Sequence, residues 1–122
     1  MRTTNRMPMR NISVVLVALA LTACVTSISD IRDREVQDDL VTDLALPAVR
    51  ECLITELSAG RQPFVNGDDT RTEITFSTEQ AGFIFHYTLT AVDGGTRVQA
   101  RRKNNIADGF NTGRKCYADS AS

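Results

Sequence analysis

The first two dozen residues constrain this chain more than any other feature. An apolar run at residues 12–21 follows a segment whose only charged side chains are Arg2, Arg6 and Arg10. A helix needs about twenty apolar residues to cross the hydrocarbon of a bilayer, so this run is too short for a permanent anchor. The short run and its basic flank are typical of a signal peptide at residues 1–23, which predicts that the rest of the chain is exported.

The end of the apolar run carries a second pattern: Leu21, Thr22, Ala23 and Cys24. These residues resemble the lipobox of bacterial lipoproteins, in which an apolar residue and two small residues precede a cysteine. The resemblance implies cleavage between Ala23 and Cys24, a diacylglycerol thioether on Cys24 and a fatty acyl chain such as palmitate on its amino group. Two or three such chains hold a protein stably on a membrane. Val25 is not the aspartate that retains enterobacterial lipoproteins in the inner membrane, which implies the periplasmic face of the outer membrane.

Two other interpretations of the leader remain open. It could be an ordinary secretory signal, with Cys24 an incidental free thiol, or a short membrane helix that is not cleaved. Beyond the lipoprotein class, residues 25–122 resemble no family that we recognise.

Removal of the leader changes the charge of the chain. The full chain has 122 residues and a formal net charge of −1, and loss of the three arginines with no acidic residue takes this to −4. An acidic mature protein argues against nucleic acid as a partner. About a hundred residues remain, which is room for a single domain.

The cysteines predict a disulfide. With Cys24 assigned to lipid, Cys52 and Cys116 remain as a pair in an oxidising compartment. A bridge between them would close a loop of about 64 residues, for which the chain-entropy estimate is roughly 4 kcal/mol. The alternatives are two buried free thiols or a metal site. Zinc favours four ligands, whereas the chain offers two thiols, one histidine and carboxylates without ligand spacing, so we expect neither a metal nor a cofactor.

Residues 24–43 are acidic and hold few apolar positions. Their charged side chains are Asp30, Asp33, Glu35, Asp38, Asp39 and Asp43, against Arg32 and Arg34. We predict an acidic tether, with helix allowed in its second half, that holds a domain of residues 44–122 away from the membrane.

One amphipathic helix is predicted at residues 47–58. Apolar residues recur there at helical intervals, Pro47 suits a first turn, and a glycine follows shortly after the end. Cys52 falls on the apolar side of this helix with Val49 and Leu53. The disulfide would therefore lie beneath the helix.

The period of the sequence then changes from helical to alternating. Three segments with alternating apolar and polar residues are predicted strands: 71–77, 83–91 and 96–103. Asp93, Gly94 and Gly95 predict a hairpin between the last two, with either Asp93-Gly94 or Gly94-Gly95 as its loop. Residues 63–70 are either a short edge strand or a loop, and residues 106–122 are read as irregular. The expected fold is α+β: one helix packed on a three- to four-stranded antiparallel meander, clamped by the disulfide.

His86 is the only imidazole in the chain. We predict that it lies on the polar side of its strand, opposite Arg101 or Lys103. A solitary histidine beside cations lacks the carboxylate that orients a general base, so we interpret it as a surface or structural residue.

No other group of residues predicts catalysis or metal binding. Asp68 and Asp69, with Glu73 nearby, lack the spacing of a calcium loop and are read as a solvated turn. We find no Ser/His/Asp order, CxxC pair or phosphate-binding glycine loop. We therefore do not expect an enzyme.

Arg97, Arg101 and Lys103 are predicted to project from one face of a strand and form a possible binding surface. Such a surface could contact anionic lipid, lipopolysaccharide, peptidoglycan or an acidic protein. The same charges are also what an edge strand uses to resist aggregation, which is the interpretation we favour.

Two functional hypotheses follow. The first is a lipid-anchored lipoprotein of the cell envelope that acts as a non-catalytic binding or structural accessory, in contact with another envelope protein or a cell-wall component. The alternative is an inhibitor or protective lipoprotein that blocks a partner enzyme.

Overall fold

The computed structural model describes residues 28–103 and 109–118. The predicted signal peptide, the cleavage point and Cys24 therefore lie outside the described residues. Among the residues that are described, no helix is both long and apolar enough to span a bilayer.

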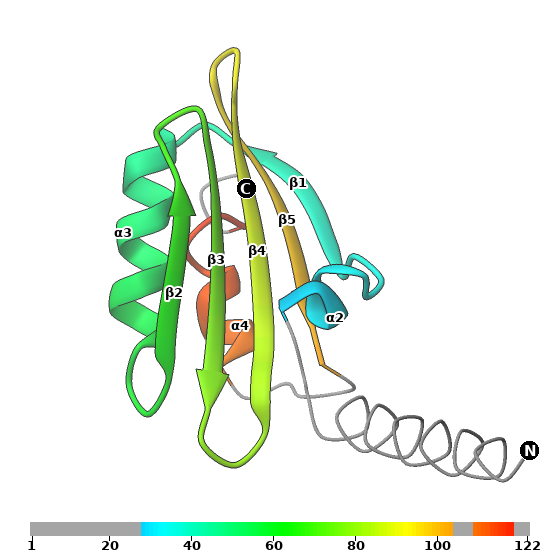
Figure 1. Cartoon of the computed structure of the whole chain (residues 1–122). Helices are drawn as coiled ribbons and strands as arrows, with labels where there is room; N and C mark the ends of the chain where they lie inside the picture. The colour runs from blue at the N-terminus through cyan, green and yellow to red at the C-terminus, as the bar shows by residue number, and fades with distance from the viewer. Residues whose placement is uncertain (1–27, 104–108, 119–122) are drawn as a thin grey trace, which may run out of the picture.

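A five-stranded antiparallel sheet forms the centre of the molecule, with the strand order β1-β5-β4-β3-β2 (Figure 1). The strands are β1 Asp38–Thr42, β2 Gln62–Gly67, β3 Arg71–Thr78, β4 Gly82–Val92 and β5 Gly95–Arg102. The described helices are α2 Ile28–Arg32, α3 Leu46–Leu57 and α4 Phe110–Arg114. Strands β2 to β5 are a meander, and α3 carries the chain from β1 at one edge to β2 at the other.

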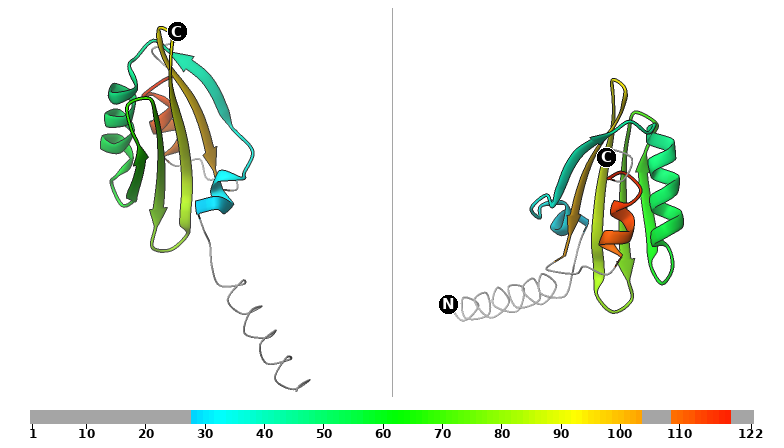
Figure 2. Two further views of the ribbon diagram at one scale, coloured as in Figure 1. Left: turned by 45° about the horizontal axis from the view of Figure 1, so that its top comes forward. Right: turned by 180° about the vertical axis from the view of Figure 1, so that it is seen from behind.

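The helices lie on both faces of the sheet (Figures 1 and 2). Helices α3 and α4 cover one face, which we call the α3 face. Helix α2 lies over β4 and β5 on the opposite face, which we call the α2 face. The sheet is therefore the middle layer of the domain.

Helix α3 confirms the helix predicted from the apolar pattern. Its core-facing residues are Leu46, Val49, Leu53 and Leu57, all buried. They recur at the spacing of one helical face. Pro47 stands in the first turn, where its missing N–H costs no hydrogen bond, and the N–H of Ser58 closes the last turn on the Ile54 carbonyl.

Strand alternation builds the rest of the core. On the α3 face lie Ile74, Phe76, Phe85, Tyr87, Leu89 and Val98, each 0% exposed. The hairpin pairs Val92 with Gly95 and Leu89 with Val98, so of the two loops that the sequence allowed, Asp93 and Gly94 form the one observed. Gly94 has φ of 80°, which is the left-handed region that this turn requires.

One apolar residue of β4 faces the other way. The register shifts between Phe76 and Ser77, so Phe83 pairs with Ser77 while Phe85 pairs with Phe76. The Phe83 ring meets the Phe64 ring edge-on, with centroids 5.7 Å apart. The sequence placed Phe83 in one series with Phe85, and this β-bulge corrects that expectation.

The predicted disulfide is present. Cys52 of α3 and Cys116, just after α4, are joined with their Cα atoms 5.7 Å apart. This geometry is ordinary for a disulfide. The α+β class, the antiparallel meander and the disulfide are thus confirmed.

The number of elements differs from the expectation of three or four strands and one helix. There are five strands, because residues 62–67 are a strand and Asp38–Thr42 adds to the free side of β5. There are three described helices, because the C-terminal stretch read as irregular holds α4. Gly113 interrupts the apolar pattern of α4, yet a Cβ there would meet the Tyr87 hydroxyl oxygen at 2.8 Å, so the helix needs a glycine to pack so closely.

The folded domain also begins earlier than expected. Helix α2 and β1 lie within residues 24–43, which the acidic composition predicted to be a tether. The acids of β1 have partners far along the chain: Asp39 binds Arg97, and Asp38 accepts hydrogen bonds from Arg114 and the Tyr117 hydroxyl. A local pattern of charge does not reveal partners at such separations, so the strand was missed.

Candidate binding surface

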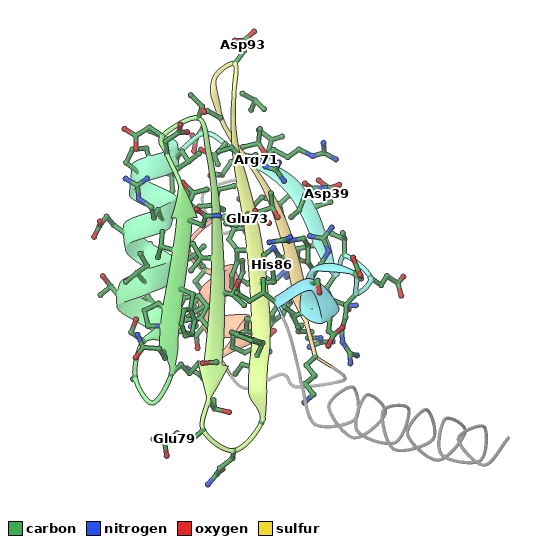
Figure 3. The ribbon with its side chains drawn as sticks, viewed as in Figure 1. Asp39, Arg71, Glu73, Glu79, His86 and Asp93 are labelled. Atoms are coloured by element: carbon green, nitrogen blue, oxygen red, sulfur yellow. A yellow bond between two sulfur atoms is a disulfide. The ribbon has the colours of Figure 1, made fainter. Side chains whose placement is uncertain are left out.

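His86 lies under α2 rather than in solvent. It pairs with Arg101 across the hairpin, as one of the two predicted registers required, and its side chain is fully buried. Glu73 contacts both His86 and Arg32 and so joins the imidazole to α2. Figure 3 shows the imidazole directed from β4 toward α2, with Glu73 beside it on β3.

A chain of polar contacts holds the imidazole. Its Nδ1 is 3.0 Å from the Thr75 hydroxyl, and its Nε2 is 3.1 Å from Glu73 Oε1. Because a carboxylate only accepts, neutral His86 carries its proton on Nε2 and donates to Glu73, while the Thr75 hydroxyl donates to Nδ1. Glu73 also accepts from Arg32 Nε at 3.1 Å. These contacts link α2 to the middle of the sheet.

Burial decides the protonation of His86. Desolvation lowers the pKa of the imidazole below its ordinary 6.5, and Arg101 and Arg32 lower it further, while Glu73 opposes the shift by charge and by hydrogen bonding. The neutral ring is therefore the form that this environment favours.

The order of hydroxyl, imidazole and carboxylate resembles that of a nucleophilic triad, but the site is closed. Thr75 is 3% exposed and His86 is 0% exposed, so no substrate atom can approach the hydroxyl. What the arrangement does is satisfy three buried polar groups and fasten α2. Sequence reasoning missed Glu73 as the partner of His86, although strand parity places residues 73 and 75 on one face.

The acidic cluster near the β2–β3 turn does not form a cation site. Asp68 Oδ1 accepts hydrogen bonds from the Thr70 hydroxyl and from the backbone N–H groups of Thr70 and Arg71. These hydrogen bonds, that of the Thr70 hydroxyl first, lower the pKa of the Asp68 carboxyl. Asp69 pairs with Arg50 at 3.0 Å, and Glu73 belongs to the His86 contacts. Within the described ranges, no group of three or more His, Cys, Asp or Glu residues could hold a metal ion.

The three basic residues of the predicted binding surface are each engaged within the domain. Arg97 binds Asp39 through two nitrogens, at 2.9 and 2.7 Å, and this contact lowers the pKa of the Asp39 carboxyl. Arg101 donates to the Arg34 carbonyl, and Lys103, just past β5, donates to the Ala81 carbonyl. The three side chains therefore lie near one another, with Arg97 in an ion pair and Arg101 and Lys103 hydrogen-bonded to backbone carbonyls.

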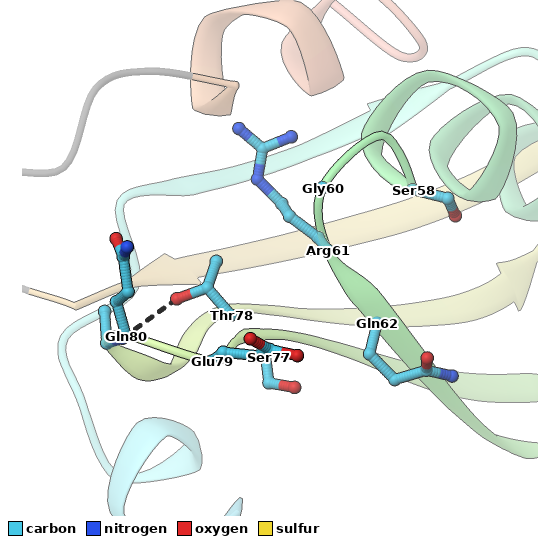
Figure 4. Close-up of a pocket in the computed structure, with 9 residues that line it drawn as sticks. Ser58, Gly60, Arg61, Gln62, Ser77, Thr78, Glu79 and Gln80 are labelled. Carbon is cyan, nitrogen blue, oxygen red and sulfur yellow. Dashed lines mark hydrogen bonds between the residues drawn. The ribbon is translucent and has the colours of Figure 1, made fainter.

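A pocket of about 720 Å³ opens between the loop after α3 and the β3–β4 turn (Figure 4). Its lining consists of small and polar residues with two charged ones, Arg61 and Glu79. The Arg61 guanidinium also binds the Leu57 carbonyl and lies over the Phe85 ring. No large apolar side chain lines the pocket, so it lacks the apolar anchor of a typical ligand site.

Exposed apolar side chains mark a different surface. The large ones among the described residues are Val41 at 53%, Phe64 at 45%, Val65 at 49% and Val92 at 38%. Phe64 pairs with Thr75, which pairs with His86, so Phe64 lies on the α2 face. Val65 pairs with Ile74 and therefore lies on the α3 face. The two neighbours point to opposite sides of the sheet.

Phe64 stands among uncharged side chains at the β2 edge of the α2 face. They form what we call the Phe64 patch: Gln62, Phe64, Asn66, Ser77 and Phe83. Buried Thr75, which contacts His86, separates Phe64 from the part of the face that α2 covers. Sequence reasoning missed the patch, although the absence of charge in residues 62–67 was visible.

Comparison with known proteins found no matching family model, no matching curated protein and no matching solved structure.

Proposed function

We propose that this protein is a lipid-anchored lipoprotein of the cell envelope, held on the periplasmic face of the outer membrane, which acts as a non-catalytic binding or structural accessory. Its partner is another envelope protein or a cell-wall component.

The pairing of the cysteines carries this proposal. Of three cysteines, two form the disulfide, and the third is Cys24 at the lipobox. A disulfide suits the oxidising compartment to which a signal peptide leads. The pairing of the other two leaves Cys24 available for the acyl chains.

The start of the folded domain fits an anchor at this position. Helix α2 begins at Ile28, only four residues after Cys24. Four residues span at most about 14 Å when extended. An anchored domain would therefore sit close to the bilayer.

The polar groups of the domain favour binding over catalysis. His86 and Thr75 are sealed beneath α2, and Arg97 is paired with Asp39. Exposed apolar side chains such as Phe64 are the kind of surface that contacts a protein or a membrane.

Mass spectrometry of the mature N-terminus tests the anchor. We expect the chain to begin at an acylated Cys24, and Cys24→Ser to remove the protein from the membrane fraction. Ser27→Ala, a small change three residues away, should leave the membrane fraction unchanged. A purified chain that retains Met1, or that begins elsewhere without acyl groups, would contradict the proposal.

Capture of partners from native envelopes by the acylated protein tests the role. A structural protein or wall fragment that is bound stoichiometrically supports an accessory. If the captured partner is an enzyme whose activity falls when the protein is added, the inhibitor role replaces it.

A further inference from the structure

Three features of the domain bear on how it meets a membrane, and they converge on one face. The first is the reach of the chain. If Cys24 carries the acyl groups, the bilayer surface must lie within about 14 Å of Ile28, because Ile28 is the fourth residue after Cys24. The inference below rests on the proposed lipid anchor for this step.

The second feature is the position of α2. Ile31 of α2 is 2% exposed, and Arg32 pairs with Glu73 at 3.1 Å on the side of the sheet away from α3. Helix α2 is therefore fastened to the α2 face, so Ile28, the first described residue, lies on that face (Figures 1 and 2). The opposite face is closed by α3 and α4.

The third feature is the chemistry of the surface beside α2. The residues of the Phe64 patch are uncharged, with Glu73 at its border opposite Asn66, and its two aromatic rings lie edge-on to each other with Phe64 45% exposed. Aromatic side chains with amide and hydroxyl neighbours are suited to the interfacial layer of a bilayer, where both apolar and polar groups are present.

We propose that the α2 face rests on the bilayer surface, with the Phe64 ring in the interfacial layer. The occupant of the patch is a zwitterionic lipid surface. The arginines of this face include Arg32 and Arg97, which pair with Glu73 and Asp39, and the mature chain is acidic overall, so anionic headgroups would not attract it.

A weak contact is enough for this arrangement. The acyl chains hold the protein on the membrane, and a four-residue link keeps the local concentration of lipid around the patch high. The contact therefore sets the orientation of the domain rather than its membrane affinity. The α3 face is turned toward the periplasm.

A tryptophan reporter tests this orientation, because the native chain contains no tryptophan. Phe64→Trp and Val65→Trp form a matched pair: the two residues are adjacent, similarly exposed, and on opposite faces of β2. Each full-length acylated variant is reconstituted into phosphatidylcholine vesicles that contain brominated lipid, which quenches nearby tryptophan. Circular dichroism and the intact disulfide verify the fold of both.

We expect quenching of Phe64→Trp to exceed that of Val65→Trp by roughly twofold or more, since interfacial side chains enter only the outer layer of the bilayer. Insertion of a flexible Gly/Ser segment of about twelve residues between Ser27 and Ile28 should reduce this difference, because it removes the limit on distance. Partial replacement by anionic lipid should not increase it.

Equal quenching of the two variants, or stronger quenching of Val65→Trp, would overturn the orientation while leaving the anchor in place. Failure of the anchor is recognised separately, since the protein would then neither float with the vesicles nor show acyl groups by mass spectrometry. In that case both proposals fail.

Discussion

The two faces of the sheet are held by different kinds of interaction. On the α3 face, buried aliphatic and aromatic side chains pack between the sheet and two helices, and a disulfide joins those helices. On the α2 face, one short helix is fastened by hydrogen bonds and ion pairs around His86. Because apolar burial scales with area and a disulfide restricts the unfolded chain, the α3 face contributes most of the stability. The α2 face instead fixes where the chain leaves the domain.

Removal of the disulfide should have the largest effect on this comparison. Replacing Cys52 and Cys116 together by Ala should lower the free energy of unfolding by roughly 4 kcal/mol, because the bridge closes a long loop in the unfolded chain. Urea denaturation followed by circular dichroism measures it. Cys24→Ser, which leaves the bridge intact, is the control and should not change the midpoint. A loss of similar size in the control would argue against the assignment of the pairing.

A methyl group at Gly113 should give the next largest effect. The Cβ of Gly113→Ala would meet the Tyr87 hydroxyl at 2.8 Å and Leu57 Cδ1 at 2.9 Å. Overpacking of this kind costs about 1–3 kcal/mol. Thermal unfolding should show the loss.

Tyr87→Phe sharpens the same test. The Tyr87 hydroxyl is buried and finds no hydrogen-bond partner among the described residues. Its removal alone should be neutral or slightly stabilising. In combination with Gly113→Ala it should recover part of the loss, and strict additivity of the two changes would show that they do not share one contact.

The α2 face should respond to pH, to a smaller extent. The pKa of His86 is lowered in the folded protein, so below about 6.5 the unfolded chain binds this proton more readily than the folded one. The free energy of unfolding should therefore be unaffected by His86 above that pH and should decline as the pH falls from 6.5 toward the folded pKa. Denaturation of the native protein and of His86→Gln at several pH values isolates the effect. A native curve parallel to that of the variant throughout would refute it.

The smallest effect is expected at the edge of the α2 face. Asp39→Asn removes the acceptor of the exposed Arg97 ion pair, and exposed pairs contribute little because water and salt screen them. The change in the unfolding midpoint should be smaller than any of those above and should shrink further at high salt. A large change that does not depend on salt would show that Asp39 has another structural role.

The sequence indicated one side of this comparison far better than the other. The spacing of Val49, Leu53 and Leu57 specified α3, and alternation with an Asp-Gly-Gly turn specified β4 and β5, with two registers left open. Both patterns are local, because helix and strand periods bring residues a few positions apart onto one face. The contacts of the α2 face could not be predicted in this way, because they join residues far apart in the sequence, such as Arg97 and Asp39.

The candidate site divides in the same way. The polar position of His86 followed from alternation, but its burial depends on α2, which comes from a segment whose composition suggested a tether. Phe83 was placed on the wrong face because the β-bulge after Phe76 depends on how two strands pair. The Phe64 patch needed both of these facts, so only the fold brings it together.

By itself the sequence determined the α+β class, the principal helix, the central hairpin and the disulfide, since each is encoded in residue spacing or in the number of cysteines. Only the tertiary structure decided that β1 and α2 belong to the domain and that Glu73 binds His86. It also decided that Phe64 lies on the α2 face and Val65 on the α3 face. The reason is physical: periodic burial is written into neighbouring residues, whereas ion pairs, bulges and the docking of short elements depend on groups that become neighbours only after the chain has folded.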